Sequence, residues 1–99
     1  DLQEEEGYLG VNIWSETGGT IAGITSNKAI SLMRKTQQHQ KTYTFSDPTQ
    51  TTKTLTLKIP KDYSRVISQS DGITYDDATE TFTINFENAA GSSKQIIVE

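Results

Sequence analysis

Side chains capable of acid–base or nucleophilic chemistry are scarce in this sequence. His39 is the only histidine, and there is no cysteine. Without a thiol, a disulfide, a thiolate metal site and a cysteine nucleophile are all excluded. A Ser-His-Asp arrangement or an imidazole metal site would have to use His39, which lies in the polar run 36–41 with no carboxylate near it in sequence. We therefore expect an exposed histidine and no catalytic residue.

Carboxylates cluster in the segment 71–80. Asp71, Asp76, Asp77 and Glu80 could bind a hard cation through oxygen atoms, but their spacing is not that of a calcium loop. Asp76 and Glu80 could form an acid/base pair only if burial shifted the pKa of one carboxyl, and a hairpin turn leaves both in water. We predict ordinary turn carboxylates, no metal site and no cofactor.

A lysine–asparagine isopeptide crosslink is the third chemistry considered. It needs a buried, neutral lysine amine beside an asparagine, with a protonated acid between them. Lys58, Asn85 and Asn12 all alternate with apolar residues in strand-like segments. Alternation places the three side chains on the faces opposite the apolar residues, so we expect no crosslink.

Tyr8 and Trp14 are the candidate ligand-binding residues. In the segment 8–14 they fall on the face opposite Leu9, Val11 and Ile13. Either the two rings face solvent, where they could stack on a sugar, or the tryptophan packs between two sheets, as is common in sandwiches.

Charge and hydropathy exclude several classes of protein. The net charge is −4, with a basic centre (+6 over 27–65) between two acidic ends (−5 each over 1–16 and 66–99). The centre could contact an anionic polymer, but paired basic and acidic strands that form a solvated mixed face are the preferred explanation. Nucleic acid is disfavoured by the acidic composition, and no apolar run approaches the length needed for membrane insertion.

The strands that must position these residues follow from alternation of apolar and polar side chains. Residues 28–35 suit either a helical turn or a strand, and the strand is preferred. Residues 36–41 are expected to form a loop or an exposed strand end, 63–67 a short extended or helical piece, and 88–93 a loop. The clear strands are 8–14, 20–25, 42–45, 52–59, 73–75, 81–86 and 94–99.

About seven to nine short strands without a long helix predict an all-β fold, an immunoglobulin-like antiparallel β-sandwich rather than a closed barrel. At 99 residues there is room for one domain. We expect an acidic tail or linker over 1–7 and a single sandwich over 8–99. Because the last strand reaches the chain end with no polar tail, we expect the domain to have been excised from a longer chain.

Three segments resemble a known family when taken in order: TKTLTLKIP (52–60), ITYDDATETFTI (73–84) and AAGSSKQIIV (89–98). Over residues 42–99 the chain is similar to immunoglobulin-like repeats of Gram-positive surface proteins and adhesins. The resemblance implies a non-catalytic structural or adhesive module, not an enzyme, that is extracellular and on the bacterial cell surface. Its partners would be neighbouring domains of the same chain and an extracellular protein or glycan ligand.

Two alternative functions stay open. One is a carbohydrate-binding accessory module that uses Tyr8 and Trp14. The other is a phage virion or pilus subunit that assembles by strand addition at an exposed edge. The lack of cysteine fits either a cytosolic protein or an exported Gram-positive one.

Overall fold

The computed structural model describes residues 7–49, 53–60, 63–86 and 93–99. These residues form ten strands and no helix. The strands are β1 (Gly7–Ile13), β2 (Gly19–Ile21), β3 (Ile24–Ser26), β4 (Ile30–Gln37), β5 (Gln40–Ser46), β6 (Lys53–Lys58), β7 (Val66–Gln69), β8 (Ile73–Asp76), β9 (Thr81–Phe86) and β10 (Ser93–Val98).

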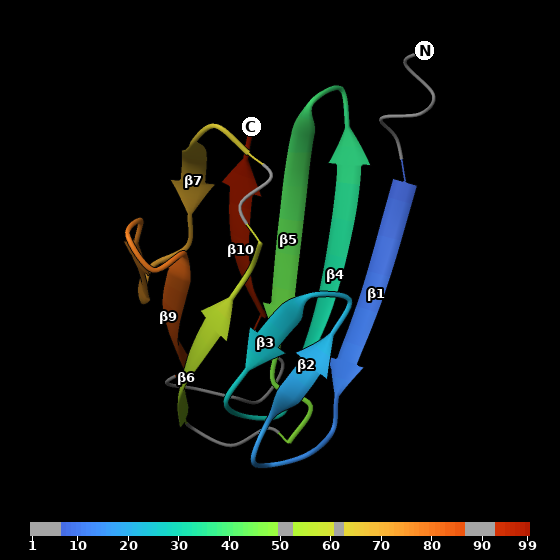
Figure 1. Ribbon diagram of the computed structural model, residues 1–99, viewed down its shortest axis with the longest axis vertical. Coiled ribbons are helices and arrows are strands. Elements are labelled where there is room, and N and C mark those ends of the chain that lie inside the picture. Colours follow the sequence, from blue (N-terminus) through green and yellow to red (C-terminus); the bar gives the residue numbers. More distant parts are fainter. Residues whose placement is uncertain (1–6, 50–52, 61–62, 87–92) are drawn as a thin grey trace.

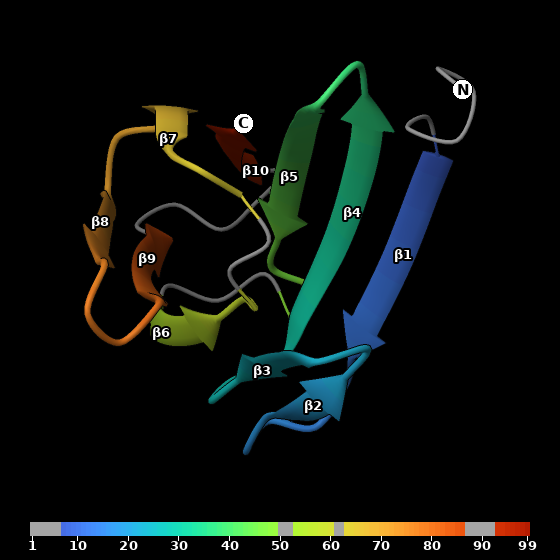
Figure 2. The same cartoon turned by 45° about the horizontal axis from the view of Figure 1, so that its top comes forward.

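The strands form two five-stranded sheets whose neighbours are all antiparallel. Sheet A has the order β1-β4-β5-β10-β7, and sheet B has the order β2-β3-β6-β9-β8. Figure 1 shows the long strands of sheet A behind the shorter strands of sheet B, and Figure 2 shows the two layers facing each other. The predicted all-β sandwich is confirmed.

A tight hairpin inside one expected strand explains why the ten described strands outnumber the expected seven to nine. The segment 20–25 divides into β2 and β3 at Ala22 and Gly23, which have φ of 53° and 79°. Two consecutive residues with positive φ make the turn that matches the twist of paired strands. Gln38 and His39, with φ of 50° and 70°, join β4 to β5 in the same way.

Several segment predictions are settled by the pairing. Residues 28–35 contribute to strand β4, so the helical alternative is wrong. Of the two alternatives for 36–41, the exposed strand end is confirmed, because β4 runs to Gln37, which pairs with Gln40 of β5, and both residues are exposed. Residues 66–69 form β7 against β10, not a helical piece.

The predicted acidic tail and the predicted 88–93 loop fall largely outside the described residues. Residues 1–6 and 88–92 are not among them, whereas Gly7 belongs to β1 and Ser93 to β10.

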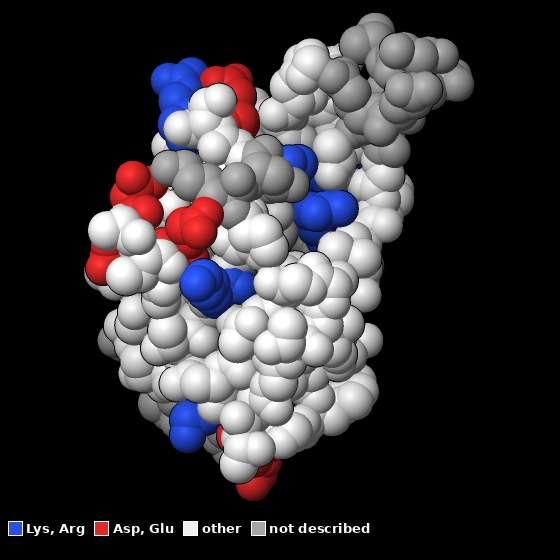
Figure 3. All heavy atoms as spheres, in the orientation of Figure 1, with Lys and Arg blue, Asp and Glu red and all other residues white. Residues whose placement is uncertain are grey.

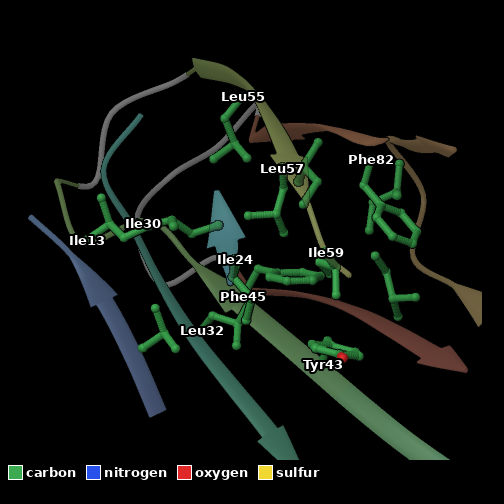
Figure 4. Close-up of a cluster of buried hydrophobic side chains, with 14 of the residues drawn as sticks. Ile13, Ile24, Ile30, Leu32, Tyr43, Phe45, Leu55, Leu57, Ile59 and Phe82 are labelled. Atoms are coloured by element: carbon green, nitrogen blue, oxygen red, sulfur yellow. The ribbon is translucent and has the colours of Figure 1, made fainter. Parts of the chain in front are cut away.

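One core fills the space between the sheets, and Figure 4 shows its side chains arriving from both of them. Burial alternates along β9 and β5 with a period of two, as half-buried strands require. Thr54 and Thr56 are exposed on the opposite face of β6. The low apolar content is therefore explained by threonine on outer faces. The buried residues of this core cluster are Val11, Ile13, Ile24, Ile30, Leu32, Tyr43, Phe45, Leu55, Leu57, Ile59, Ile73, Phe82, Ile84, Phe86, Ile96 and Val98.

The two sheets do not cover each other completely. In Figure 1, β4 and β5 extend upward beyond β2 and β3. Burial on the inner face of sheet A falls toward the end where β1 begins: Leu9, Arg34 and Lys41 are half-buried there, whereas Val11, Leu32 and Tyr43, farther along the same strands, are buried. This partly open end positions the candidate site described next.

Candidate functional site

His39 and the turn carboxylates do not form a reactive cluster. His39 lies in the exposed β4–β5 turn. The Asp76 carboxylate accepts a hydrogen bond from the Ala78 amide (3.0 Å), and Asp77 accepts one from the Tyr75 hydroxyl (3.3 Å). Within the part of the chain that the structure describes, no group of three or more His, Cys, Asp or Glu residues could hold a metal ion.

The residues considered for a crosslink lie on outer faces, as alternation predicts. Lys58 is exposed. The side-chain oxygen of Asn85 accepts a hydrogen bond from the Thr54 hydroxyl at 2.7 Å, and that of Asn12 accepts one from the Ser31 hydroxyl at 2.9 Å. These asparagines link neighbouring strands through ordinary hydrogen bonds.

Tyr63 is a half-buried titratable group that stays protonated. Its hydroxyl donates to the Tyr75 hydroxyl at 3.0 Å, and the Tyr75 ring stacks on Phe82 with ring centroids 4.3 Å apart. Burial, followed by the hydrogen bond to Tyr75, raises the pKa of Tyr63 well above its usual range. The hydroxyl is therefore unsuited to act as a base and serves the packing of sheet B.

Tyr8 and Trp14 face solvent. Their side chains are 74% and 68% exposed, so the alternative of a tryptophan packed between the sheets is wrong. Tyr8 lies on the outer face of β1, which is the edge strand of sheet A, and Trp14 directly follows the last residue of that strand. Met33, 47% exposed, pairs with Gly10 between them, and a Cβ placed on Gly10 would lie 3.9 Å from Met33 Cε. Tyr8, Met33 and Trp14 are exposed apolar residues spread over about 20 Å, from the rise of a strand, with the polar pair Asn12 and Ser31 between Met33 and Trp14. We call this surface the β1 strip.

Sequence reasoning missed a second feature, which centres on Arg34. In β4, Arg34 pairs with Leu9 on one side and with Tyr43 on the other. It continues the inward-facing series of Ile30 and Leu32, both buried. The alternation of inward-facing residues along β4 could have identified Arg34 from the sequence. A charged side chain at an inward position of a sandwich strand is costly unless it has a partner.

Arg34 lines a pocket at the partly open end of the sandwich. The pocket has a volume of about 190 Å³ and is otherwise lined by Ala22, Ile24, Tyr43, Ile59 and Pro60. Arg34 Nε is buried and has no hydrogen-bond partner among the described residues. A buried donor left unsatisfied costs about 1–3 kcal/mol. We call this feature the Arg34 pocket.

Comparison with known proteins places this sandwich among parts of polysaccharide-degrading enzymes. A family model described as polysaccharide lyase family 8, C-terminal beta-sandwich domain, matches residues 2–56. That match covers more than half of the chain, so the chain belongs to this family of β-sandwich domains.

Individual relatives agree with this family assignment, since they are polysaccharide lyases. The chain is 99% identical over 97 residues to hyaluronate lyase HylB of Enterococcus faecalis (strain ATCC 700802 / V583), covering 98% of this chain and 10% of the relative. It is 34% identical over 91 residues to the xanthan lyase of Bacillus sp. (strain GL1), covering 88% and 10%. The solved structure of Paenibacillus xanthan lyase matches with a TM-score of 0.79 at 29% identity, over 92% of this chain and 9% of that one. The chain thus spans about a tenth of the length of the curated relatives it matches.

These findings correct the functional prediction. The resemblance to surface-protein repeats holds at the level of a β-sandwich, but the family is a lyase domain and not an adhesin repeat. The expectations of a structural or adhesive module and of a non-enzyme are wrong, as are the accessory-module and virion or pilus alternatives. The error has a physical source, because the matched hairpins are common to many sandwiches. The family model instead matches residues 2–56, most of which the resemblance did not cover.

The structure has no helix among its described residues that is long and apolar enough to cross a membrane.

Proposed function

We propose that this chain is a β-sandwich domain of a lyase that cleaves hyaluronan. The observation that carries the proposal is the 99% identity to a hyaluronate lyase over 98% of the chain. The lower identity to a xanthan lyase, 34%, is what a shared scaffold with a different substrate would give.

We place the catalytic groups in parts of the parent chain outside these 99 residues. A lyase that abstracts a proton beside a carboxylate needs a base within hydrogen-bond reach and a group that neutralises the carboxylate. His39 lies in an exposed turn, and Asp76 and Asp77 accept hydrogen bonds within the β8–β9 turn. Tyr63 is held protonated by burial. None of these groups is arranged as such a pair, which favours a supporting role for the domain.

We propose that the parent enzyme acts outside the cell of a Gram-positive bacterium. A long polyanionic polysaccharide cannot cross a lipid bilayer, so an enzyme that degrades it must meet it outside. The Enterococcus relative is consistent with that setting.

The test compares three proteins: the full parent chain, the same chain without these 99 residues, and the 99-residue chain alone. Cleavage by elimination leaves an unsaturated uronate, whose ultraviolet absorbance is followed with hyaluronan or xanthan as substrate. We expect the full chain to cleave hyaluronan in preference to xanthan and the 99-residue chain to release nothing above background. A full chain inactive on hyaluronan would contradict the proposed function. Product released by the 99-residue chain would contradict the placement of the catalytic groups.

We also propose that Tyr8 and Trp14 are ligand-contact residues of the lyase chain, with the polysaccharide as the ligand. Tyr8 lies on the edge strand β1 and Trp14 directly after it, and both rings are largely exposed. Gly10 between them carries no side chain, which leaves the strand surface open to an extended polymer. Aromatic rings offer large, rigid apolar surfaces of the kind that sugar C–H faces pack against.

The double variant Tyr8→Ala/Trp14→Ala in the full chain tests this contact. Loss of two ring contacts of about 0.5–1.5 kcal/mol each is expected to raise the KM for long hyaluronan about tenfold with kcat unchanged, the pattern of lost ground-state binding. Ile67→Ala is the matched control, since Ile67 is an exposed apolar residue on β7 at the other edge of sheet A. An unchanged KM with a lower Tm of the full chain would show that the rings pack against a neighbouring domain instead.

A further inference from the structure

Arg34 brings a guanidinium to the inner face of sheet A. Its buried Nε is not satisfied by the described hydrogen bonding, since that atom has no partner among the described residues. The second arginine of the chain is different, because Arg65 Nε and Nη2 bind Glu99 Oε1 at 2.9 and 2.8 Å on the surface. A cation in such a position is favourable only when an anion reaches it.

The walls of the Arg34 pocket explain what kind of anion would fit. Its described lining combines the charged Arg34 with Tyr43 and the aliphatic side chains of Ala22, Ile24, Ile59 and Pro60, and binding sites typically set a few polar groups among apolar walls. Its volume of about 190 Å³ lies below the roughly 300–1,000 Å³ of sites for drug-sized ligands. The pocket therefore suits one small charged group, such as one end of a single sugar, and not a length of polymer.

A second basic residue, Lys41, lies on the same face of sheet A as Arg34. Lys41 pairs with Thr36 and lies two residues from Tyr43 along β5, so it shares the inner face with Arg34 at a diagonal position. Diagonal neighbours on one face lie about 7–8 Å apart. Figure 3 shows Lys and Arg atoms gathered over the upper parts of β4 and β5. The described turn carboxylates Asp76 and Asp77 lie on sheet B, at the β8–β9 connection.

We propose that the Arg34 pocket binds the carboxylate of one uronate residue of the polysaccharide. The proposal rests on the proposed function for the identity of the polymer, since hyaluronan carries a carboxylate in every repeat. Arginine is suited to this ligand because its planar fork donates two parallel hydrogen bonds to a carboxylate. The site lies on the inner side of sheet A and is separate from the β1 strip on the outer side. It adds a second, charge-selective contact with the polymer.

Binding is measured by calorimetric titration of the 99-residue chain, which keeps a complete hydrophobic core within its own two sheets. The probes are a hyaluronan oligosaccharide and the same oligosaccharide with its carboxylates reduced to alcohols. We expect the reduced probe to bind about tenfold more weakly than the acidic one. Arg34→Gln should weaken binding of the acidic probe by about the same factor, the effect of losing one charged hydrogen-bonded pair. Arg34→Lys should recover only part of the loss, because an ammonium lacks the fork.

Arg65→Gln is the matched control and should leave the affinity unchanged. Equal affinity of wild type and Arg34→Gln, or equal binding of the two probes, would overturn the proposal. A third outcome would also overturn it: Arg34→Gln lowers the Tm of the full chain but changes neither the Tm nor the affinity of the 99-residue chain. That result would assign the pocket to a carboxylate of a neighbouring domain. Because the titration needs no turnover, failure of the uronate site is distinguishable from failure of the lyase activity, which is assayed on the full wild-type chain.

Discussion

Replacing Phe45 with alanine is expected to lower the free energy of unfolding by about 3–5 kcal/mol, the range for phenylalanine removed from a well-packed core. The Phe45 ring is fully buried on β5, the central strand of sheet A. Figure 4 shows it among side chains from both sheets, including Leu32 from sheet A and Ile24 from sheet B. It also stacks on Tyr43, with ring centroids 6.2 Å apart and planes 11° from parallel. The cavity left by the ring is bounded by two hydrogen-bonded sheets, which limits how far the walls can collapse.

For a domain of this size such a loss is a large part of the total stability, which is typically about 5–15 kcal/mol. The Tm should fall by about 12 °C or more, at roughly 4–8 °C per kcal/mol. Urea and thermal unfolding followed by far-ultraviolet circular dichroism measure the change. Tryptophan fluorescence is a poor reporter, because Trp14 is already 68% exposed in the folded chain.

Two control variants separate burial from strand propensity. Phe45→Leu keeps most of the volume and should cost less than about 1.5 kcal/mol. Thr44→Ala changes the neighbouring position on the outer face and should stay within about 0.5–1 kcal/mol of wild type. A Phe45→Ala variant as stable as Thr44→Ala would show that the two sheets are not held by this core.

The core could be predicted because burial on a strand has a period of two. Leu55, Leu57 and Ile59 alternate with threonine and lysine, and all three are buried in the structure. The phase of one strand is a local property, so it can be inferred without knowing the neighbouring strands. The order of strands in the two sheets depends on contacts between distant segments, and no local pattern predicts it.

The β2–β3 and β4–β5 turns were harder to predict because three of their residues other than glycine have positive φ. Ala22, Gln38 and His39 replace the Asn-Gly and Asp-Gly pairs that signal a two-residue hairpin. The twist of the paired strands imposes the left-handed conformation on these residues, at a cost that strand pairing offsets. Turn propensity therefore could not locate the breaks between β2 and β3 or between β4 and β5.

The candidate site was only half predictable. Alternation placed Tyr8 and Trp14 on one face of the segment 8–14, but whether that face meets water depends on what packs against the sheet. Arg34 was missed because residues 28–35 suited either a helix or a strand. Without that choice, the inward-facing and outward-facing positions of this segment could not be assigned. Once β4 is a strand, Ile30 and Leu32 fix the inward face and Arg34 must share it. The function could not be predicted from the fold class, because β-sandwiches host many unrelated activities.

Gly18→Ala is expected to lower the free energy of unfolding by about 3 kcal/mol or more. This figure is the sum of a backbone-strain cost and an overpacking cost. Gly18 has φ of 84°, a conformation that side chains with a Cβ rarely adopt. A Cβ at this position would collide with the Ser26 carbonyl oxygen and lie 2.7 Å from Asn27 Cα. The obstructing backbone cannot retreat, because the Asn27 amide donates to Thr56 O at 3.2 Å and Asn27 Oδ1 accepts from the Thr56 amide at 2.8 Å. The methyl group must therefore displace the turn that leads into β2 or break the pairing of β3 with β6.

Gly10→Ala is the matched control, with the same substitution in an open position of β1. Its Cβ would make an ordinary contact of 3.9 Å with Met33 Cε, and Gly10 does not have positive φ. Glycine inside a strand costs about 0.5–1 kcal/mol relative to alanine, so Gly10→Ala should be neutral or stabilising by up to that amount. Urea unfolding gives the two free energies, and amide hydrogen exchange at Asn27 and Thr56 reports whether the β3–β6 pairing opens in Gly18→Ala. Two variants of equal stability, whether both tolerated or both destabilised, would contradict the contrast, because conformation and local space differ between these glycines while the added methyl group is the same.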